Sequence, residues 1–242
     1  MGTATDSSSP LRAEEVREFA EEKTELLAQN PDLNEEETKA AIITDFIRLL
    51  GWEIPLDGRI EYQFGEHNTN IVDYALLDDG VSKVFVEAKS PGTGLDGHRS
   101  QITEYLALDN VELGVLTNGE VYEVYRTHIS TDDEVQRQQV ARFELGEFPE
   151  YLDVLNSLTK EEVTSGSYKD RLQRVVDLND ARTALKENRQ TISRDIVGTV
   201  TDTVGSIAQE PAREHVNEYL DQIHAELGAA NDIGTASPES VS

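Results

Sequence analysis

The residues best suited to chemistry are three charged side chains near the middle of the chain: Asp73, Glu87 and Lys89. Asp73 lies in the run TNIVDYALL at 69–77, and the other two end the run KVFVEAK at 83–89. Because successive strand residues point to opposite faces of a sheet, Glu87 and Lys89 share one face. Both runs are otherwise largely apolar, which indicates central strands, and a charge on a central strand needs a partner.

The short connection between these runs sets their register. Only the tripeptide DDG at 78–80 joins them, which predicts a β-hairpin. A turn centred near Gly80 places Asp73 directly opposite Glu87. Opposed residues of an antiparallel pair have Cβ atoms about 4.5–5.5 Å apart, so two carboxylates would lie side by side. Such a pair is unfavourable unless a cation or a proton separates the charges.

Lys89 supplies one cation for this pair, and a divalent metal could supply the other. Oxygen-only ligands suit Mg²⁺ or Mn²⁺. Either ion activates a water molecule and neutralises charge on a phosphate, which is the chemistry of phosphodiester hydrolysis. The alternative is an ordinary Glu-Lys pair on a solvated hairpin face. The five histidines have no metal-ligand spacing and the chain has no cysteine, so a zinc site is not expected.

The hydrophobic pattern predicts the elements that position these residues. Helical spacing covers residues 10–29 and residues 34–50. A glycine-rich loop at 90–97 leads into a helix over 98–108. Strands are predicted at 60–64, 69–77, 83–89, in a hairpin over 113–126 that turns at Asn118-Gly119, and at 140–145.

These elements predict an α/β (α+β) fold, a mixed sheet flanked by helices, with a C-terminal helical extension. The extension has helix breaks near Gly166, Gly205 and Pro211, and its amphipathic spacing suits packing on the core or a homo-oligomer contact. An interaction protein whose helical part is the functional one is therefore a further alternative. The expected organisation is an N-terminal helix over 1–29, the core over 30–148, the extension over 149–227 and a disordered tail over 228–242.

The composition is strongly acidic. The 242 residues include 48 acidic and 21 basic ones, which gives a formal net charge of -27. Such self-repulsion is screened at about 1 M salt, where the Debye length is roughly 3 Å, so the composition is typical of a salt-loving (halophilic) host. A basic partner or a disordered acidic chain is less favoured, because strand patterns interrupt the acidic residues. Any phosphate-binding surface must be a local positive region.

Targeting signals are not evident. No apolar stretch approaches the roughly 18 residues of a membrane span, and residues 1–10 are polar without a hydrophobic signal region. We therefore expect a cytoplasmic protein with no membrane partner.

The order of the motifs resembles a known nuclease group. Asp73 followed by Glu87-Ala88-Lys89 is similar to the Asp…Glu-x-Lys signature of the restriction-endonuclease-like, or PD-(D/E)xK, superfamily. More narrowly, residues 30–145 resemble the N-terminal nuclease domain of the restriction subunit of type I restriction enzymes. The matching segments are NEEETKAAIITDFIRLLGWEI at 34–54, VDYALL at 72–77, VFVEAK at 84–89, Gln101-x-x-x-Tyr105 and GVLTNGEVYEVY at 114–125.

The resemblance implies a role for each residue of the central motif. Asp73 and Glu87 would bind Mg²⁺ or Mn²⁺ together with the Ala88 carbonyl oxygen. Lys89 would position the attacking water or stabilise the charge that develops on the phosphorus group.

Residues outside the central motif receive supporting roles. Glu37 matches the acidic residue of the helix before the sheet, which assists metal or water binding, although Asn34-x-x-Glu37 is equally a helix capping box. Gln101 and Tyr105 match the Gln-x-x-x-Tyr motif and would orient the DNA backbone or the lysine, against the alternative of a plain helix surface. The candidate phosphate contacts beside the glycine-rich loop are His98 and Arg99.

The expected function is a Mg²⁺-dependent DNA endonuclease, with DNA and possible restriction-modification subunits as partners. A catalytically silent DNA-binding or assembly subunit of a restriction or defence system is the alternative within the same fold. Two features depart from the family pattern: Val72 stands where many members have proline, and the chain has no G-x-x-x-x-G-K-[ST] loop. We therefore expect neither an ATP-driven motor nor an organic cofactor.

Overall fold

The computed structural model describes residues 10–65, 70–129 and 135–229. The chain divides into two compact units, the first ending at Leu172 and the second beginning at Gln173. Residues 228 and 229 of the predicted disordered tail are helical, and the remainder, from residue 230 onward, lies outside the described residues.

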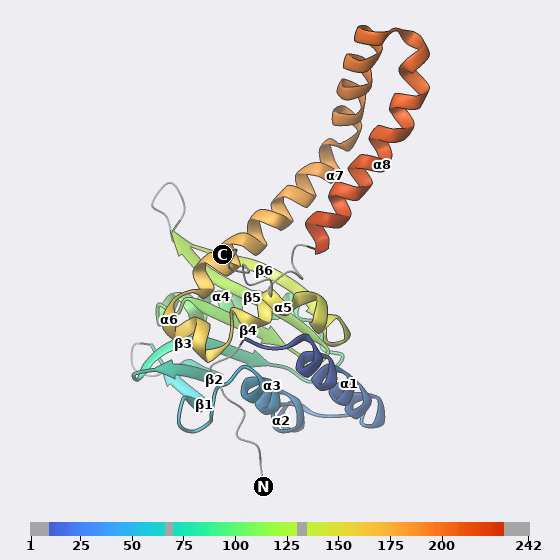
Figure 1. Ribbon diagram of the computed structural model, residues 1–242. Coiled ribbons are helices and arrows are strands. Elements are labelled where there is room, and N and C mark those ends of the chain that lie inside the picture. Colours follow the sequence, from blue (N-terminus) through green and yellow to red (C-terminus); the bar gives the residue numbers. More distant parts are fainter. Residues whose placement is uncertain (1–9, 66–69, 130–134, 230–242) are drawn as a thin grey trace, which may run out of the picture. The chain divides into compact units, whose positions relative to one another are not determined.

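A single six-stranded sheet forms the centre of the first unit, with the strands in sequence order (Figure 1). Neighbouring strands are antiparallel except for β3 and β4, which are parallel. The strands are β1 (Gly58–Phe64), β2 (Asn70–Asp78), β3 (Val81–Ala88), β4 (Leu113–Thr117), β5 (Val121–Ile129) and β6 (Val135–Glu144). The predicted α/β architecture is confirmed.

Helices flank this sheet. The first group comprises α1 (Ala13–Gln29), α2 (Glu35–Thr38), the π-helical turn η1 (Lys39–Ile43) and α3 (Thr44–Leu49). Figure 1 shows α1, α2 and α3 grouped together beside the sheet. The crossover between β3 and β4 contains the 3-10 turn η3 (Asp96–His98) and α4 (Arg99–Leu108). The predicted helix over 34–50 is therefore interrupted by a π-helical turn.

Aromatic side chains join the first group of helices to the sheet. The ring centroid of Phe46 on α3 lies 4.9 Å from that of Tyr122 on β5 and 5.9 Å from that of Phe148. Phe19 on α1 stacks on Phe148 at 5.9 Å. Such ring pairs contribute about 0.5–1.5 kcal/mol each beyond their buried area. The N-terminal helix is thus part of the core of the first unit.

The segment after β6 also belongs to this unit. It contains η4 (Leu145–Tyr151), α5 (Leu152–Asn156), α6 (Lys160–Ser165) and the start of α7 (Tyr168–Val204). The buried Trp52 indole N–H donates to the Leu158 carbonyl oxygen at 2.9 Å, and the Lys160 N–H donates to the Leu50 carbonyl at 2.9 Å. These contacts join the segment after residue 148 to the first unit, which ends at Leu172.

The opposite layer of the core lies under α4. Buried residues from the sheet and the crossover pack together here: Phe64, Val72, Ala75, Phe85, Leu95, Ile102, Leu106, Val111, Leu116 and Tyr125. Gly114 on β4 allows α4 to approach, because a Cβ atom there would lie 3.0 Å from Leu106 Cδ1 and 3.2 Å from Ile102 Cγ1. This contact fixes α4 over β3 and β4.

The second unit contains the rest of α7, the 3-10 turn η5 (Ser206–Ala208) and α8 (Gln209–Ala229). Arg189 links the two helices through the Asn217 carbonyl oxygen at 3.0 Å and Asp221 at 2.8 Å. The predicted breaks at Gly166 and Gly205 are confirmed, and both residues have positive φ. The break predicted at Pro211 is wrong, because proline in the first turn of α8 removes no intrahelical hydrogen bond.

Among the described residues, no helix is both long and apolar enough to cross a membrane.

Candidate active site

The β2–β3 hairpin brings Asp73 and Glu87 together. The regular ladder ends at the pair Tyr74 with Val86, and the same register continued by one residue sets Asp73 opposite Glu87. The predicted pairing is present, but the turn that produces it differs from the predicted one. The turn itself is two residues long, with Asp78 paired to Val81, and a bulge between Leu76 and Leu77 shifts the register by one.

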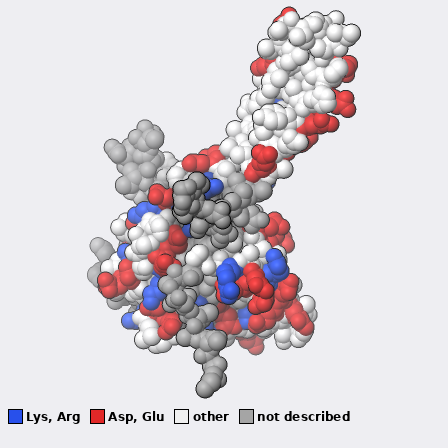
Figure 2. Space-filling model, viewed as in Figure 1, with Lys and Arg blue, Asp and Glu red and all other residues white. Residues whose placement is uncertain are grey.

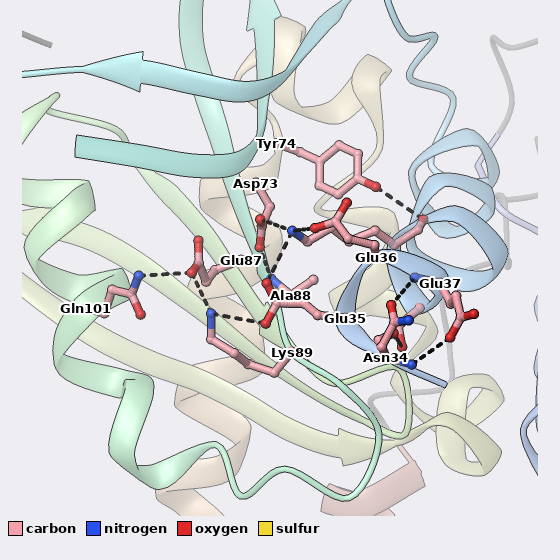
Figure 3. Close-up of polar contacts among 12 residues, drawn as sticks. Asn34, Glu35, Glu36, Glu37, Asp73, Tyr74, Glu87, Ala88, Lys89 and Gln101 are labelled. Carbon is pink, nitrogen blue, oxygen red and sulfur yellow. Dashed lines mark hydrogen bonds and ion pairs between the residues drawn. The ribbon is translucent and has the colours of Figure 1, made fainter. Parts of the chain in front are cut away.

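Asp73 sits where β2 leaves the regular ladder. On its other side, the pairs of β1 with β2 skip the position of Glu61, which has a φ of 49°. Freed from regular pairing, the Asp73 carboxylate takes over one backbone hydrogen bond: its Oδ2 accepts from the Ala88 N–H at 2.7 Å (Figure 3). The side chain is thereby locked between the two strands.

Glu87 is buried beside Asp73, with 4% of its surface exposed. Its Oε1 accepts hydrogen bonds from Lys89 Nζ at 2.7 Å and from Gln101 Nε2 at 2.9 Å. Its Oε2 is buried and has no hydrogen-bond partner among the described residues. Burial, and then the negative charge of Asp73, raise the pKa of Glu87, whereas the Lys89 hydrogen bond opposes this shift.

A second lysine, Lys39, occupies the Asp73 side of the site. Its Nζ lies 2.6 Å from Asp73 Oδ1, 2.8 Å from Glu36 Oε1 and 3.2 Å from Glu35 Oε1. Burial alone would lower the pKa of Lys39, but the hydrogen bonds to Asp73 and Glu36 outweigh it and raise that pKa. We refer to Asp73, Glu87, Lys39 and Lys89 as the Asp73–Glu87 site.

The helix before the sheet contributes Glu35 and Glu36 rather than Glu37. The Glu37 carboxylate accepts from the Asn34 N–H at 2.9 Å, and the Asn34 side chain accepts from the Glu37 N–H at 3.0 Å. This is the capping box that the sequence allowed as one of two interpretations. Glu35 instead reaches both lysines, with its Oε2 4.0 Å from Lys89 Nζ. The structure therefore places Glu35 against the two lysines of the site and Glu37 in the helix cap.

Gln101 and Tyr105 act together on Glu87. They lie one turn apart on α4, and Gln101 Nε2 donates both to Glu87 Oε1 and to the Tyr105 hydroxyl, each at 2.9 Å. The Tyr105 ring packs edge-on against Phe64, with 5.0 Å between centroids. The structure thus brings both residues to the site, where Tyr105 orients the Gln101 amide.

The two candidate phosphate contacts, Arg99 and His98, make hydrogen bonds to other groups of the protein. Arg99 Nε donates to Glu123 Oε2 at 2.9 Å, and its Nη2 lies 2.6 Å from Glu123 Oε1 and 2.8 Å from Asp96 Oδ1. Its guanidinium is thus committed to carboxylates, which weakens its assignment as a phosphate contact. His98 ends η3 and is half-buried, and its N–H donates to the Leu95 carbonyl oxygen at 2.9 Å.

Sequence reasoning missed the carboxylate that holds Arg99. Glu123 is fully buried and lies in one cross-strand row with Glu87, because both pair with Leu116. Burial alone would raise the pKa of Glu123, but hydrogen bonds from Arg99, Tyr125 and Arg142 lower it. The alternation VYEVY at 121–125 already places Glu123 on a buried strand, which is the signal that could have found it.

Acidic side chains are prominent on the surface of the protein (Figure 2). On the face shown in Figure 2, Asp and Glu side chains are widely spread, and Lys and Arg lie in small groups between them. Positive charge near the site therefore comes from particular residues, notably Lys39 and Lys89, and not from a broad basic surface.

The donor atoms of the site fit a hard divalent cation. Among the described residues, no group of three His, Cys, Asp or Glu side chains is arranged to hold a metal ion. Two carboxylates are nevertheless adjacent, and a buried carboxylate oxygen such as Glu87 Oε2 is unfavourable without a cation or donor. Mg²⁺ commonly binds through one or two carboxylates and keeps several water molecules. Asp73, Glu87 and the Ala88 carbonyl remain the residues that would hold it.

Comparison with known proteins gives a distant structural likeness. No family model and no curated protein matches this sequence. Among solved structures, the chain is similar to one described as a cryo-EM structure of a DrdV–DNA complex, with 17% sequence identity and a TM-score of 0.38. The match covers 79% of this chain and 17% of the other, so this chain spans under a fifth of that protein's length.

Proposed function

We propose that this chain is a Mg²⁺- or Mn²⁺-dependent DNA endonuclease of the restriction-endonuclease-like type, similar to the nuclease domain of type I restriction subunits. One observation carries the proposal. Asp73 and Glu87 come from adjacent strands, Lys89 pairs with one of them, and a buried Glu87 oxygen has no partner among the described residues. A buried carboxylate oxygen without a partner is unfavourable, and here it lies beside a second carboxylate, where a cation would stabilise both.

Each side chain then has a task in phosphodiester hydrolysis. Asp73 and Glu87 would hold the cation, and the Lys89 ammonium, whose side chain is 12% exposed, would donate a hydrogen bond to the reacting phosphate or water. Gln101 fixes the orientation of the Glu87 carboxylate, so its free oxygen keeps one direction. The bound Mg²⁺ would supply charge neutralisation at the phosphate and activation of a water molecule.

Plasmid cleavage tests this proposal. Purified wild type is incubated with supercoiled plasmid and Mg²⁺ or Mn²⁺ in high salt, beside Asp73→Asn, Glu87→Gln and Lys89→Met. We expect nicked and linear product from wild type and at least about a 10³-fold lower rate from each variant. Asp32→Asn, an exposed carboxylate on the loop before α2, is the matched control and should cleave like wild type.

The same experiment decides against the proposal if wild type leaves the plasmid intact with both metals, or if the three variants cleave like wild type. Circular dichroism of each variant checks that the fold is retained.

A second candidate is a catalytically silent DNA-binding or assembly subunit. The observation that favours it is that Lys39 already neutralises Asp73 without any metal. This candidate predicts DNA retention in a gel-shift assay with no cleavage, and no change in binding when Mg²⁺ is replaced by EDTA. Cleavage that depends on Asp73 would exclude it.

Partners follow from the same proposal. We propose restriction-modification subunits as partners that would supply target recognition. We also propose that the second unit, α7 with α8, provides a homo-oligomer contact, as the exposed Ile196, Ile207 and Tyr219 side chains suit one. Light scattering of the whole chain, compared with the triple change of these residues to serine, tests this: a monomeric wild type would contradict it.

A further inference from the structure

Lys39 is an unusual residue for a candidate metal site. It comes from the helix layer, yet its side chain is 9% exposed and its ammonium lies within 3.2 Å of three carboxylates. The shortest contact, 2.6 Å, is to Asp73 Oδ1 (Figure 3). The other oxygen of Asp73 is held by the Ala88 N–H. Lys39 therefore takes the Asp73 oxygen that is not bound to the backbone.

The backbone fixes Lys39 in this place. Lys39 begins the π-helical turn η1, and its carbonyl oxygen accepts from the Thr44 hydroxyl at 2.9 Å and from the Tyr74 hydroxyl at 3.2 Å. Tyr74 is the neighbour of Asp73 on β2. Lys39 lies at the junction of α2 and the π-helical turn, and its carbonyl oxygen is hydrogen-bonded to the strand that carries Asp73. Hydrogen bonds to the Lys39 carbonyl oxygen thus hold the main chain of Lys39 close to β2, where Asp73 lies.

We propose that the Lys39 ammonium competes with the divalent cation for Asp73 Oδ1. Lys39 must leave or share this oxygen before the ion can bind between Asp73 and Glu87. This inference rests on the proposed function, since it concerns how the same site is loaded. Glu87 Oε2, buried and without a partner among the described residues, is the open half of that site. Asp73 Oδ1 is the other half, and the Lys39 ammonium occupies it.

The physical reason is electrostatic. A divalent ion bound to Asp73 would lie close to a fixed positive charge, and two unit charges about 4 Å apart already interact appreciably even in water. Glu35 and Glu36 offer the displaced ammonium an alternative place, because both already contact it. Lys39 would thereby keep the site neutral without metal and raise the metal concentration needed to load it.

Metal affinity, measured without any substrate, tests the proposal. Calorimetric Mg²⁺ titration and Mn²⁺ electron paramagnetic resonance are run on wild type and on Lys39→Met, whose side chain keeps a similar length without charge. We expect Lys39→Met to bind either metal on the order of tenfold more tightly at fixed ionic strength. Asp73→Ala in each background identifies the binding that belongs to this site.

Lys23→Met is the matched control. Lys23 is a buried lysine of α1 that likewise contacts two carboxylates, Glu22 at 2.9 Å and Asp45 at 2.7 Å. Removing it changes net charge by the same amount, so the site-specific proposal predicts unchanged metal affinity. Equal tightening in both variants would reduce the effect to net charge and overturn the proposal.

Two further outcomes separate this inference from the proposed function. If metal binds wild type in an Asp73-dependent way but Lys39→Met binds with equal or lower affinity, Lys39 is not a competitor, although the nuclease proposal stands. If neither protein shows Asp73-dependent binding, both are overturned. Thermal melting of Lys39→Met in EDTA and in Mg²⁺ checks folding, and stabilisation by Mg²⁺ should exceed that of wild type.

Discussion

The Asp73 carboxylate closes the β2–β3 ladder by accepting the Ala88 N–H at 2.7 Å, one residue beyond the last backbone pair. One side chain therefore has two functions, since it also faces Glu87 and pairs with Lys39. Structural and catalytic roles of Asp73 should be separable by substitution.

Asp73→Asn and Asp73→Ala make that separation. Asparagine keeps an oxygen for the Ala88 N–H but removes the charge, whereas alanine removes both. We expect alanine to lower the free energy of unfolding by about 2–3 kcal/mol and asparagine to lower it by about 1 kcal/mol less. The reason is that only the alanine variant leaves the Ala88 N–H without an acceptor. Urea unfolding measures this. Equal losses of stability would mean that the hydrogen bond to the Ala88 N–H contributes nothing. Both variants should lose cleavage, because both remove the charge of Asp73.

Tyr105→Phe tests the orientation of Gln101. The change removes the hydroxyl bonded to Gln101 Nε2 but keeps the ring against Phe64. We expect cleavage to fall about tenfold and Mg²⁺ affinity to fall with it, with less than about 1 kcal/mol of stability lost, because the carboxylate proposed to hold the ion is less firmly oriented. Tyr62→Phe, which also packs on Phe64, is the control. An unchanged single-turnover rate would contradict the role.

Glu123→Gln should destabilise the first unit strongly. Glu123 is fully buried and bonded to Arg99, Arg142 and Tyr125, so its removal leaves two guanidinium groups without their shared charge. We expect a loss of about 3–5 kcal/mol in urea unfolding at neutral pH. Arg142→Met, at a side chain that is 46% exposed, should lose less than about 1 kcal/mol. Similar losses for both would show that the burial of Glu123 is not decisive.

Acid should remove the contribution of Glu123. Hydrogen bonds from Arg99, Tyr125 and Arg142 overcome burial and lower its pKa in the folded state. Its stabilising contribution is therefore complete above the ordinary glutamate pKa and is lost as the pH falls through the lowered folded-state value. The difference in unfolding free energy between wild type and Glu123→Gln should shrink steadily below about pH 4. A difference that grows on acidification would mean the sign is reversed.

Gly114→Ala tests the packing of α4. The added Cβ would lie 3.0 Å from Leu106 Cδ1 and 3.2 Å from Ile102 Cγ1, which forces the helix away from β4. We expect a loss of about 1–3 kcal/mol and a lower cleavage rate, since Gln101 lies on the same helix. Gly94→Ala, where nothing lies within 4 Å of the added atom, is the control. Unchanged melting of Gly114→Ala would show that α4 relaxes freely.

Several features were determined by the sequence itself. Alternating apolar residues predicted the β2–β3 and β4–β5 hairpins, whereas the register that sets Asp73 near Glu87 also needs a bulge between Leu76 and Leu77 that the sequence did not indicate. The four-residue spacing of Gln101 and Tyr105 put both on one helix face, where they now share a hydrogen bond. These are local relationships, set by the periods of strand and helix, so a single sequence is enough to find them.

The tertiary structure decided which distant charges meet. The sequence allows both Asn34-x-x-Glu37 and Glu35-x-x-x-Lys39 as functional spacings. In the structure, the capping box occupies Glu37, whereas the π-helical turn and the approach of β2 bring Lys39 and Glu35 to the Asp73–Glu87 site. In the same way, Arg99 at the start of α4 meets Glu123 on β5, 24 residues along the chain. Such pairings depend on packing between elements far apart in the sequence, and no local period encodes them.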